Sequence, residues 1–204
     1  MKSSPKPPWV ANLLANADRV WLFLDYDGTL AELAPTPEHV SPDQDVVDLV
    51  TGLAGHPAVR VAVISGRRLS HVEKLVPVPG AFLAGTYGVE LRMPDGRRVN
   101  RANLGVLRPA LDQLKLCWQQ LVGRHPSFFL EDKGWALALH GRYADHSEAE
   151  TVLAEARQMA VRAIQDAPAA LYRLLGGQKF LEVGPAVAHK GRTVDYICLL
   201  YTSD

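Results

Sequence analysis

The chain has 204 residues, of which 48% are hydrophobic and 22% are charged, as in ordinary soluble globular proteins. Lysine plus arginine equals aspartate plus glutamate at 22 each, so the whole chain lacks the basic field that attracts nucleic acid or an acidic membrane. Its two cysteines have no paired spacing, and it shows neither a signal peptide nor a run of about eighteen apolar residues. We therefore expect a cytoplasmic protein without a disulfide framework.

The first third of the chain alternates apolar runs with helical patterns. Val20–Leu24 and Val59–Ile64 are apolar runs typical of buried parallel strands. Between them a capping box predicts a helix, with Ser41 as the cap, proline at the first helical position, Gln44 completing the box and Gly55 at the end. A second helical pattern follows the second run. This alternation predicts an α/β fold with a parallel sheet, in which ligands bind beyond the carboxyl ends of the strands.

The middle of the chain has a different order of elements, which predicts a small α+β layer inserted into the first. The middle part opens with a hairpin around residues 94–96; the expected elements of the inserted layer then follow in chain order: a helix over 107–121, two short strands within 128–139, a helix over 147–164 and a hairpin over 171–183 that turns around Gly176-Gly177. We place the inserted layer at residues 106–183 and the core at residues 1–105 and 184–204. The residues from Arg192 to Leu200 predict a final helix.

Two acids, Asp25 and Asp27, follow the first apolar run directly in the string DYDGTL. Like charges this close disfavour joint ionisation unless a cation or hydrogen bonds hold them. Asp-Gly is also common turn chemistry, so a plain turn is the alternative interpretation. Ser65 ends the second predicted strand, where its hydroxyl and the following N–H groups could hold an anion or simply cap a helix. Lys190 follows the predicted insertion, and the alternative for it is a solvated surface lysine.

Together these segments resemble the phosphatases of the haloacid-dehalogenase superfamily, and the string Ser65-Gly66-Arg67 is closest to its sugar-phosphate phosphatases. The resemblance implies that Asp25 attacks phosphorus and forms an aspartyl-phosphate, while Asp27 protonates the leaving oxygen and then activates water. It implies a phosphate-holding role for Ser65 and a charge-balancing role for Lys190. The backbone of Gly28 and Thr29 would leave room for the phosphate, and Gly66 and Arg67 would contact the substrate.

The predicted insertion carries motifs that resemble the cap of trehalose-6-phosphate phosphatases: EDKG at Glu131 to Gly134, HGR at His140 to Arg142, and FLEVGP at Phe180 to Pro185. By this resemblance Glu131, Lys133, Arg142 and Glu182 would bind the sugar, because ionised groups make strong, directional bonds to hydroxyls. The alternative is a charged hairpin with cross-strand pairs. Gly88 and Glu90 also match the family and are expected beside the site.

The resemblance implies Mg²⁺, held by Asp25 and the Asp27 carbonyl together with a further acid from a Gly-Asp-Asp stretch. We expect this chain to lack that stretch and to be C-terminally truncated relative to the family, with Asp204 as a conceivable substitute. Three functions stay open: a monomeric Mg²⁺-dependent phosphatase for trehalose 6-phosphate, a phosphatase for another sugar phosphate, or an impaired fragment that only binds a phosphosugar. The cap motifs favour the first.

Overall fold

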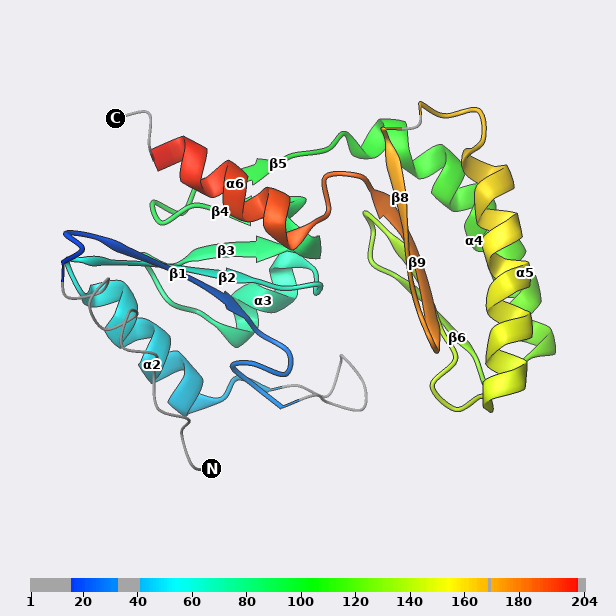
Figure 1. Cartoon of the computed structure of the whole chain (residues 1–204), viewed down its shortest axis with the longest axis horizontal. Helices are drawn as coiled ribbons and strands as arrows, with labels where there is room; N and C mark the ends of the chain where they lie inside the picture. The colour runs from blue at the N-terminus through cyan, green and yellow to red at the C-terminus, as the bar shows by residue number, and fades with distance from the viewer. Residues whose placement is uncertain (1–15, 33–40, 169, 202–204) are drawn as a thin grey trace.

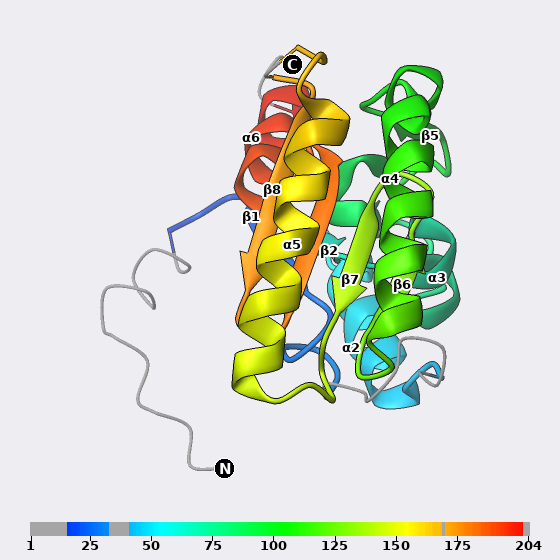
Figure 2. The same ribbon diagram turned by 90° about the vertical axis from the view of Figure 1, so that its right-hand side faces the viewer.

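The computed structural model describes residues 16–32, 41–168 and 170–201. Its strands form two separate sheets, one of five strands and one of four. Figures 1 and 2 show that the five-stranded sheet lies with α2, α3 and α6, whereas the four-stranded sheet lies with the two long helices α4 and α5. Pro35 and Pro37 predict a loop after the first strand; this segment and Asp204 lie outside the described residues.

The first sheet has the strand order β1 (Val20–Asp25), β2 (Val59–Ile64), β3 (Phe82–Gly85), β4 (Glu90–Arg92) and β5 (Arg98–Asn100). The first three strands are parallel, and β4 and β5 form an antiparallel hairpin at the edge. The predicted strands at residues 20–24 and 59–64 are therefore confirmed. The register pairs the end of β1 with the end of β2, and that in turn with β3, so three carboxyl ends meet at one edge.

Helices cover the two faces of this sheet. α2 (Gln44–Gly55) and α3 (Leu69–Leu75) pack against the face that carries Val61 and Val63. α6 (Lys190–Tyr201) packs Ile197 against the opposite face, where alternate residues of β2 and β3 point. Figure 1 shows α6 on one side of the sheet and α2 and α3 on the other. The helix predicted for residues 192–200 is confirmed as part of α6.

The start of α2 corrects one prediction. The sequence suggests Ser41 as the cap and proline as the first helical residue, but the helix begins at Gln44 with Asp43 as its N-cap. The Asp43 carboxylate accepts a hydrogen bond from the Asp45 N–H at 2.9 Å. Gln44 does not complete a capping box, because its amide donates forward to Asp48 instead. Aspartate and serine are equally good caps, so the pattern alone does not choose between them.

The second sheet is antiparallel throughout, in the order β6 (Phe129–Asp132), β7 (Leu137–His140), β9 (Phe180–Pro185) and β8 (Tyr172–Gly177). One face packs against α4 (Leu104–Arg124) and α5 (His146–Ile164) through the largest buried cluster in the described part of the chain. The Trp118 indole N–H donates to the Ala156 carbonyl at 3.1 Å and ties the two helices together. These elements run from residue 104 to residue 185, slightly beyond the expected limits.

The turn between β8 and β9 also differs from the prediction. The sequence places it at Gly176-Gly177, but both glycines belong to β8, and the turn follows them. A Cβ atom at Gly177 would lie 2.4 Å from the Phe180 ring, so close cross-strand packing explains that glycine. Within the described ranges, no helix combines the length and the apolar character that crossing a membrane requires.

Candidate active site between the two sheets

Asp25 and Asp27 reach one pocket because a tight turn follows β1. Asp25 is the last residue of the strand, and the Tyr26 side chain points into the core with no exposed surface. The Tyr26 carbonyl then accepts the Leu30 N–H at 3.0 Å, and Gly28 adopts a positive φ of 78°. Alternate residues of an extended segment point the same way, so both carboxylates line the pocket.

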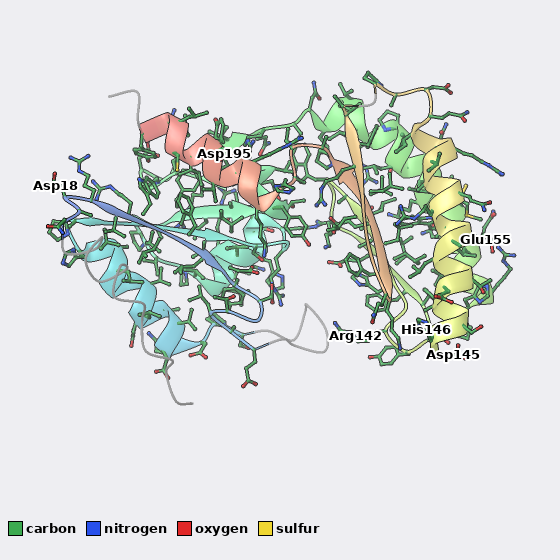
Figure 3. The ribbon with its side chains drawn as sticks, in the orientation of Figure 1. Asp18, Arg142, Asp145, His146, Glu155 and Asp195 are labelled. Carbon is green, nitrogen blue, oxygen red and sulfur yellow. The ribbon has the colours of Figure 1, made fainter. Side chains whose placement is uncertain are left out.

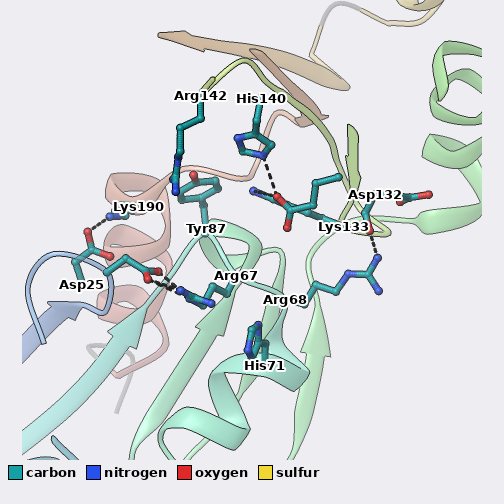
Figure 4. Close-up of a pocket in the computed structure, with 13 residues that line it drawn as sticks. Asp25, Arg67, Arg68, His71, Tyr87, Asp132, Lys133, His140, Arg142 and Lys190 are labelled. Carbon is teal, nitrogen blue, oxygen red and sulfur yellow. Dashed lines mark hydrogen bonds and ion pairs between the residues drawn. The ribbon is translucent and has the colours of Figure 1, made fainter. Parts of the chain in front are cut away.

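Each acid is paired with its own cation. Lys190, the first residue of α6, forms an ion pair with the Asp25 carboxylate. Arg67 holds both oxygens of Asp27, with its Nη2 2.7 Å from Oδ1 and its Nε 3.0 Å from Oδ2. Figure 4 shows Asp25 against Lys190, with Arg67 in the same pocket. The Arg67 guanidinium therefore makes a two-pronged, charge-assisted contact with the Asp27 carboxylate.

Ser65 lies beneath this pair rather than on the pocket surface. Its side chain is fully buried, and its hydroxyl donates weakly to Asp27 at 3.4 Å. The same oxygen accepts the backbone N–H of Arg67 at 3.1 Å, which fixes the turn between β2 and α3. Gly66 lines the pocket, whereas Gly28 and Thr29 are exposed and do not. A Cβ at Gly66 would lie 2.7 Å from the Tyr87 hydroxyl, so a larger residue there would displace the Tyr87 ring.

The second sheet contributes the opposite wall. Glu131 at the end of β6 meets Lys133 at 3.8 Å and the His140 Nε2 at 3.0 Å. Burial alone would raise the pKa of Glu131, but the hydrogen bond from His140 and the charge of Lys133 outweigh it, and the pKa lies below its ordinary value. The Arg142 side chain points toward Tyr87 and Lys190 in Figure 4. Figure 3 places Arg142 at the same end of this half of the molecule as Asp145, the N-cap of α5.

Glu182 is buried behind Lys133. Its side chain is 3% exposed, and its two oxygens accept from Lys133 at 2.8 Å and from Arg173 at 3.2 Å. Burial alone would lower the pKa of Lys133, but attraction to Glu182 and Glu131 outweighs it and raises that pKa. Lys133 therefore stays charged. Glu182 does not line the pocket, and its contact with Lys133 holds that side chain in place.

The pocket has a volume of about 440 Å³ and is lined by both halves of the chain. The sequence motifs point to most of the lining, but five residues had no role assigned to them: Arg68, His71, Tyr87, Asp132 and His140. Two of these, Asp132 and His140, stand inside motifs quoted above, and Tyr87 stands inside the matched segment from Gly85 to Glu90. Arg68 follows the Ser65 motif and donates to the Asp132 carbonyl, so it joins the two halves beside the pocket.

Tyr87 enters the pocket from η2 (Thr86–Gly88), a short helical turn after β3. Both Thr86 and Tyr87 have positive φ values, 48° and 54°, which non-glycine residues seldom adopt. The Arg173 guanidinium lies 5.0 Å above the Tyr87 ring. Burial, and to a smaller degree the charge of Glu182, raises the pKa of the Tyr87 hydroxyl, which therefore stays protonated.

Gly88 and Glu90, which the sequence places beside the site, support it from below. Glu90 accepts the Leu69 N–H at 3.2 Å and the Thr86 hydroxyl at 3.3 Å, so it connects the start of α3 with η2. Neither residue lines the pocket. A Cβ at Gly88 would lie 1.9 Å from the Thr193 hydroxyl, and a positive φ of 92° adds a second reason for glycine.

The residues at the end of β1 offer oxygen ligands, the type that a hard cation prefers, but they offer few of them. Asp25 and Asp27 offer the oxygen atoms that Mg²⁺ prefers, and the pocket has room for water or phosphate oxygens to complete the coordination. Within residues 16–32, 41–168 and 170–201 there is no cluster of three or more His, Cys, Asp or Glu side chains that could hold a metal ion. The described residues thus fit Mg²⁺ only as a two-donor site.

Comparisons with known proteins show which family the chain belongs to. The family model described as trehalose-phosphatase matches residues 23–204. The trehalose-phosphate phosphatase of Mycobacterium ulcerans is 29% identical over 177 residues, which are 86% of this chain and 43% of that protein. An uncharacterized glycosyl hydrolase of Mycobacterium tuberculosis is 32% identical over 189 residues, 90% of this chain but 13% of its own length. This chain spans less than half the length of either relative.

Among solved structures, the C-terminal domain of the Candida albicans trehalose-6-phosphate phosphatase superimposes with a TM-score of 0.79. That superposition covers 96% of this chain and 67% of that domain, at 22% identity. It confirms the α/β fold with a mostly parallel sheet that the sequence predicts. On the evidence of the matching family model, the chain belongs to the trehalose-phosphatase family.

Proposed function

We propose that this chain carries the site of a phosphatase that hydrolyses trehalose 6-phosphate to trehalose and phosphate. The observation that carries the proposal is the pocket itself. Asp25, Asp27 and Lys190 stand on one wall, and Glu131 and Lys133 stand on the other. One wall has the groups for phosphoryl transfer and the other has charged groups for sugar hydroxyls. The proposal includes a monomer that acts on a small molecule in the cytoplasm.

In this mechanism Asp25 attacks phosphorus while the bond from phosphorus to the sugar oxygen breaks. The leaving oxygen takes a proton from Asp27, so free sugar departs and the phosphoryl group stays on the Asp25 carboxylate. Asp27, now ionised, removes a proton from water, which attacks the same phosphorus and releases inorganic phosphate. Lys190 balances the negative charge that builds up around Asp25. Ser65 shapes the phosphate-binding turn through the Arg67 N–H.

Arg67 gives this mechanism an internal requirement. While the guanidinium holds both Asp27 oxygens, neither oxygen is free to approach a leaving group. Phosphate oxygens are also good partners for a planar guanidinium. We infer that a bound phosphoryl group draws Arg67 away from Asp27, which frees the Asp27 carboxyl to face the leaving sugar oxygen. Arg67 and Gly66 are thus phosphate contacts, and Gly28 and Thr29 keep the turn open on the solvent side.

Mg²⁺ completes the proposal, with Asp25 and the Asp27 carbonyl as its protein ligands. When bound, such an ion supplies Lewis-acid stabilisation of the transferring phosphoryl group. The sugar is held by Glu131, Lys133 and Arg142, which line the pocket, while Glu182 acts through Lys133. The inserted layer is in this proposal the substrate-specificity cap, and its polar wall is the reason for preferring trehalose 6-phosphate.

Two alternatives remain distinct from this proposal. The same chemistry could serve another sugar phosphate, or the chain could bind a phosphosugar without turnover. Phosphate release should be measured with trehalose 6-phosphate, sucrose 6-phosphate and glucose 6-phosphate, using wild type and Asp25→Asn in Mg²⁺. We expect the highest kcat/KM with trehalose 6-phosphate and a loss of several orders of magnitude in the variant. A preference for another sugar supports the first alternative, and binding without phosphate release supports the second.

A further inference from the structure

The Thr193 hydroxyl is buried at the junction of α6 with η2, one helical turn after Lys190. The residue has no exposed surface. Its hydroxyl donates to the Tyr87 carbonyl at 2.8 Å and accepts from Arg101 Nη1 at 2.9 Å. The same Arg101 nitrogen donates to the Gly88 carbonyl at 3.2 Å. One hydroxyl and one guanidinium therefore tie α6 to the turn that follows β3.

Arg101 lies in the short segment that joins β5 to α4, where the chain first passes from one sheet to the other. α6 begins just after the chain returns through β9. The Arg101 guanidinium also lies 4.4 Å from the Tyr196 ring centroid, on the next turn of α6. The cluster thus joins both passages of the chain between its two halves, at the helix that carries Lys190. Figure 1 shows these passages, one from β5 to α4 and the other from β9 to α6.

Gly88 makes room for this contact. A side chain at residue 88 would collide with the Thr193 hydroxyl, since the Cβ position lies 1.9 Å from that oxygen. The neighbouring Tyr87 holds a left-handed backbone conformation, and its carbonyl is the acceptor for Thr193. Backbone conformations of this kind persist where the surrounding contacts over-determine them.

We propose that Thr193, held by Arg101, is a positioning residue for Lys190: it fixes α6 on η2 so that the Lys190 ammonium stays against Asp25 during phosphoryl transfer. Residues three apart lie on the same side of a helix, so a constraint at Thr193 acts directly on the turn that Lys190 begins. The expected effect on turnover rests on the proposed function. The expected effect on the contact between Lys190 and Asp25 does not rest on it.

The alternative is that the Thr193 side chain only packs in the core and its hydroxyl does not position α6. Valine has nearly the same shape and removes just the hydroxyl, so Thr193→Val separates the two interpretations. Serine keeps the hydroxyl and should restore the behaviour of wild type. Thr51→Val is the matched control, because the exposed Thr51 hydroxyl donates within α2, to the Val47 carbonyl.

The first readout needs no turnover. A zero-length carbodiimide joins a carboxylate to an amine only where the two are in contact, and mass spectrometry can quantify the Lys190–Asp25 cross-link. The Lys115–Asp132 pair, at 2.9 Å in the other half of the chain, is the internal standard. We expect Thr193→Val to lower the Lys190–Asp25 yield about threefold or more relative to the standard, because a loosened helix no longer holds the pair in one geometry. Thr193→Ser and Thr51→Val should not.

The second readout is steady-state phosphate release per folded molecule. Thr193→Val should lower kcat about tenfold with a small change in KM, the pattern of an interaction lost mainly in the transition state. Arg101→Lys should give the same pattern, since a single ammonium does not reproduce the guanidinium contacts. If Thr193→Val folds poorly, Arg101→Lys provides the same test.

An unchanged cross-link yield in folded Thr193→Val or Arg101→Lys would overturn the positioning role. So would a normal kcat in a variant whose cross-link yield has fallen. Absence of phosphate release from wild type itself, with the cross-link pattern as expected, would instead count against the proposed function and leave the geometric inference standing.

Discussion

At the scale of single residues, the site is built from opposite charges in contact. Asp25 faces Lys190, Asp27 faces Arg67, and Glu131 and Glu182 share Lys133. These pairs explain how several carboxylates coexist in one pocket. They also mean that the phosphate and hydroxyl groups of a bound substrate must replace contacts that these side chains already make with one another.

Asp27→Asn tests the acid and base role. An amide can neither protonate the leaving sugar nor activate water, so the variant should form the aspartyl-phosphate slowly and hydrolyse it poorly. Rapid-quench measurements of sugar and phosphate release separate the two steps. Asp48→Asn, at an exposed acid on α2, is the control. A normal steady-state rate in Asp27→Asn would remove Asp27 from the mechanism.

Lys133→Ala tests the sugar wall. A charge-assisted bond contributes about 1.5 to 3 kcal/mol, so kcat/KM for trehalose 6-phosphate should fall by about one to two decades. p-Nitrophenyl phosphate, which lacks the sugar, should lose much less. Lys74→Ala changes an exposed lysine of α3 and should affect neither substrate. Equal losses on both substrates would show that Lys133 supports the fold or the phosphate wall.

At the scale of elements, most helices and strands could be predicted from local sequence patterns. Apolar runs fixed β1 and β2 because a buried strand needs a continuous apolar stretch, and helical periodicity found α3, α4, α5 and α6. The cap of α2 was misplaced, because Ser41 and Asp43 both have side chains that can accept the first N–H bonds. The backbone conformation just before the helix decides which of the two residues is the N-cap.

Asp43→Ala tests that correction. Loss of the cap bond to the Asp45 N–H should lower the free energy of unfolding by about 1 kcal/mol, a typical value for an N-cap. Ser41→Ala removes the cap that the sequence suggested and should change it much less. Urea unfolding of both variants provides the comparison. A larger effect at Ser41 would return the cap to the predicted position.

Asp132, at the end of β6, links this element to α4 and makes stability depend on pH. Burial alone would raise its pKa, but hydrogen bonds from Arg108 and Lys115 outweigh it and hold the pKa of Asp132 well below its ordinary value of 3.8. A carboxyl whose pKa is lower in the folded state stabilises the fold fully at pH values above its unfolded-state pKa. That stabilisation is lost as the pH falls from the unfolded-state pKa through the folded-state pKa.

Asp132→Asn should therefore destabilise the protein at neutral pH by about 1 to 3 kcal/mol, because the charge-assisted bonds are lost. The difference from wild type should shrink as the pH falls below about 4. Urea unfolding at several pH values measures it. Asp112→Asn is the control, since Asp112 binds the same Arg108 from a more exposed position. A difference that stays constant down to low pH would contradict this assignment.

At the scale of the whole molecule, the site exists only because two halves of the chain meet. Asp25, Asp27, Ser65 and Lys190 could be predicted, since each stands in a recognisable local string. The contributions of Arg68 and Tyr87 could not, because their positions depend on how the second sheet sits over the first. The left-handed turn that aims Tyr87 has no signal in the sequence beyond the following glycine.

The most direct test of the central claim is to locate the phosphoryl group during turnover. Protein mixed with trehalose 6-phosphate and Mg²⁺ is quenched in acid, digested and mapped by mass spectrometry. We expect the phosphoryl group on the peptide that contains Asp25, and we expect it to be absent from Asp25→Asn treated in the same way. Absence of a phosphoryl group on Asp25, whether or not sugar is released, would contradict the proposal.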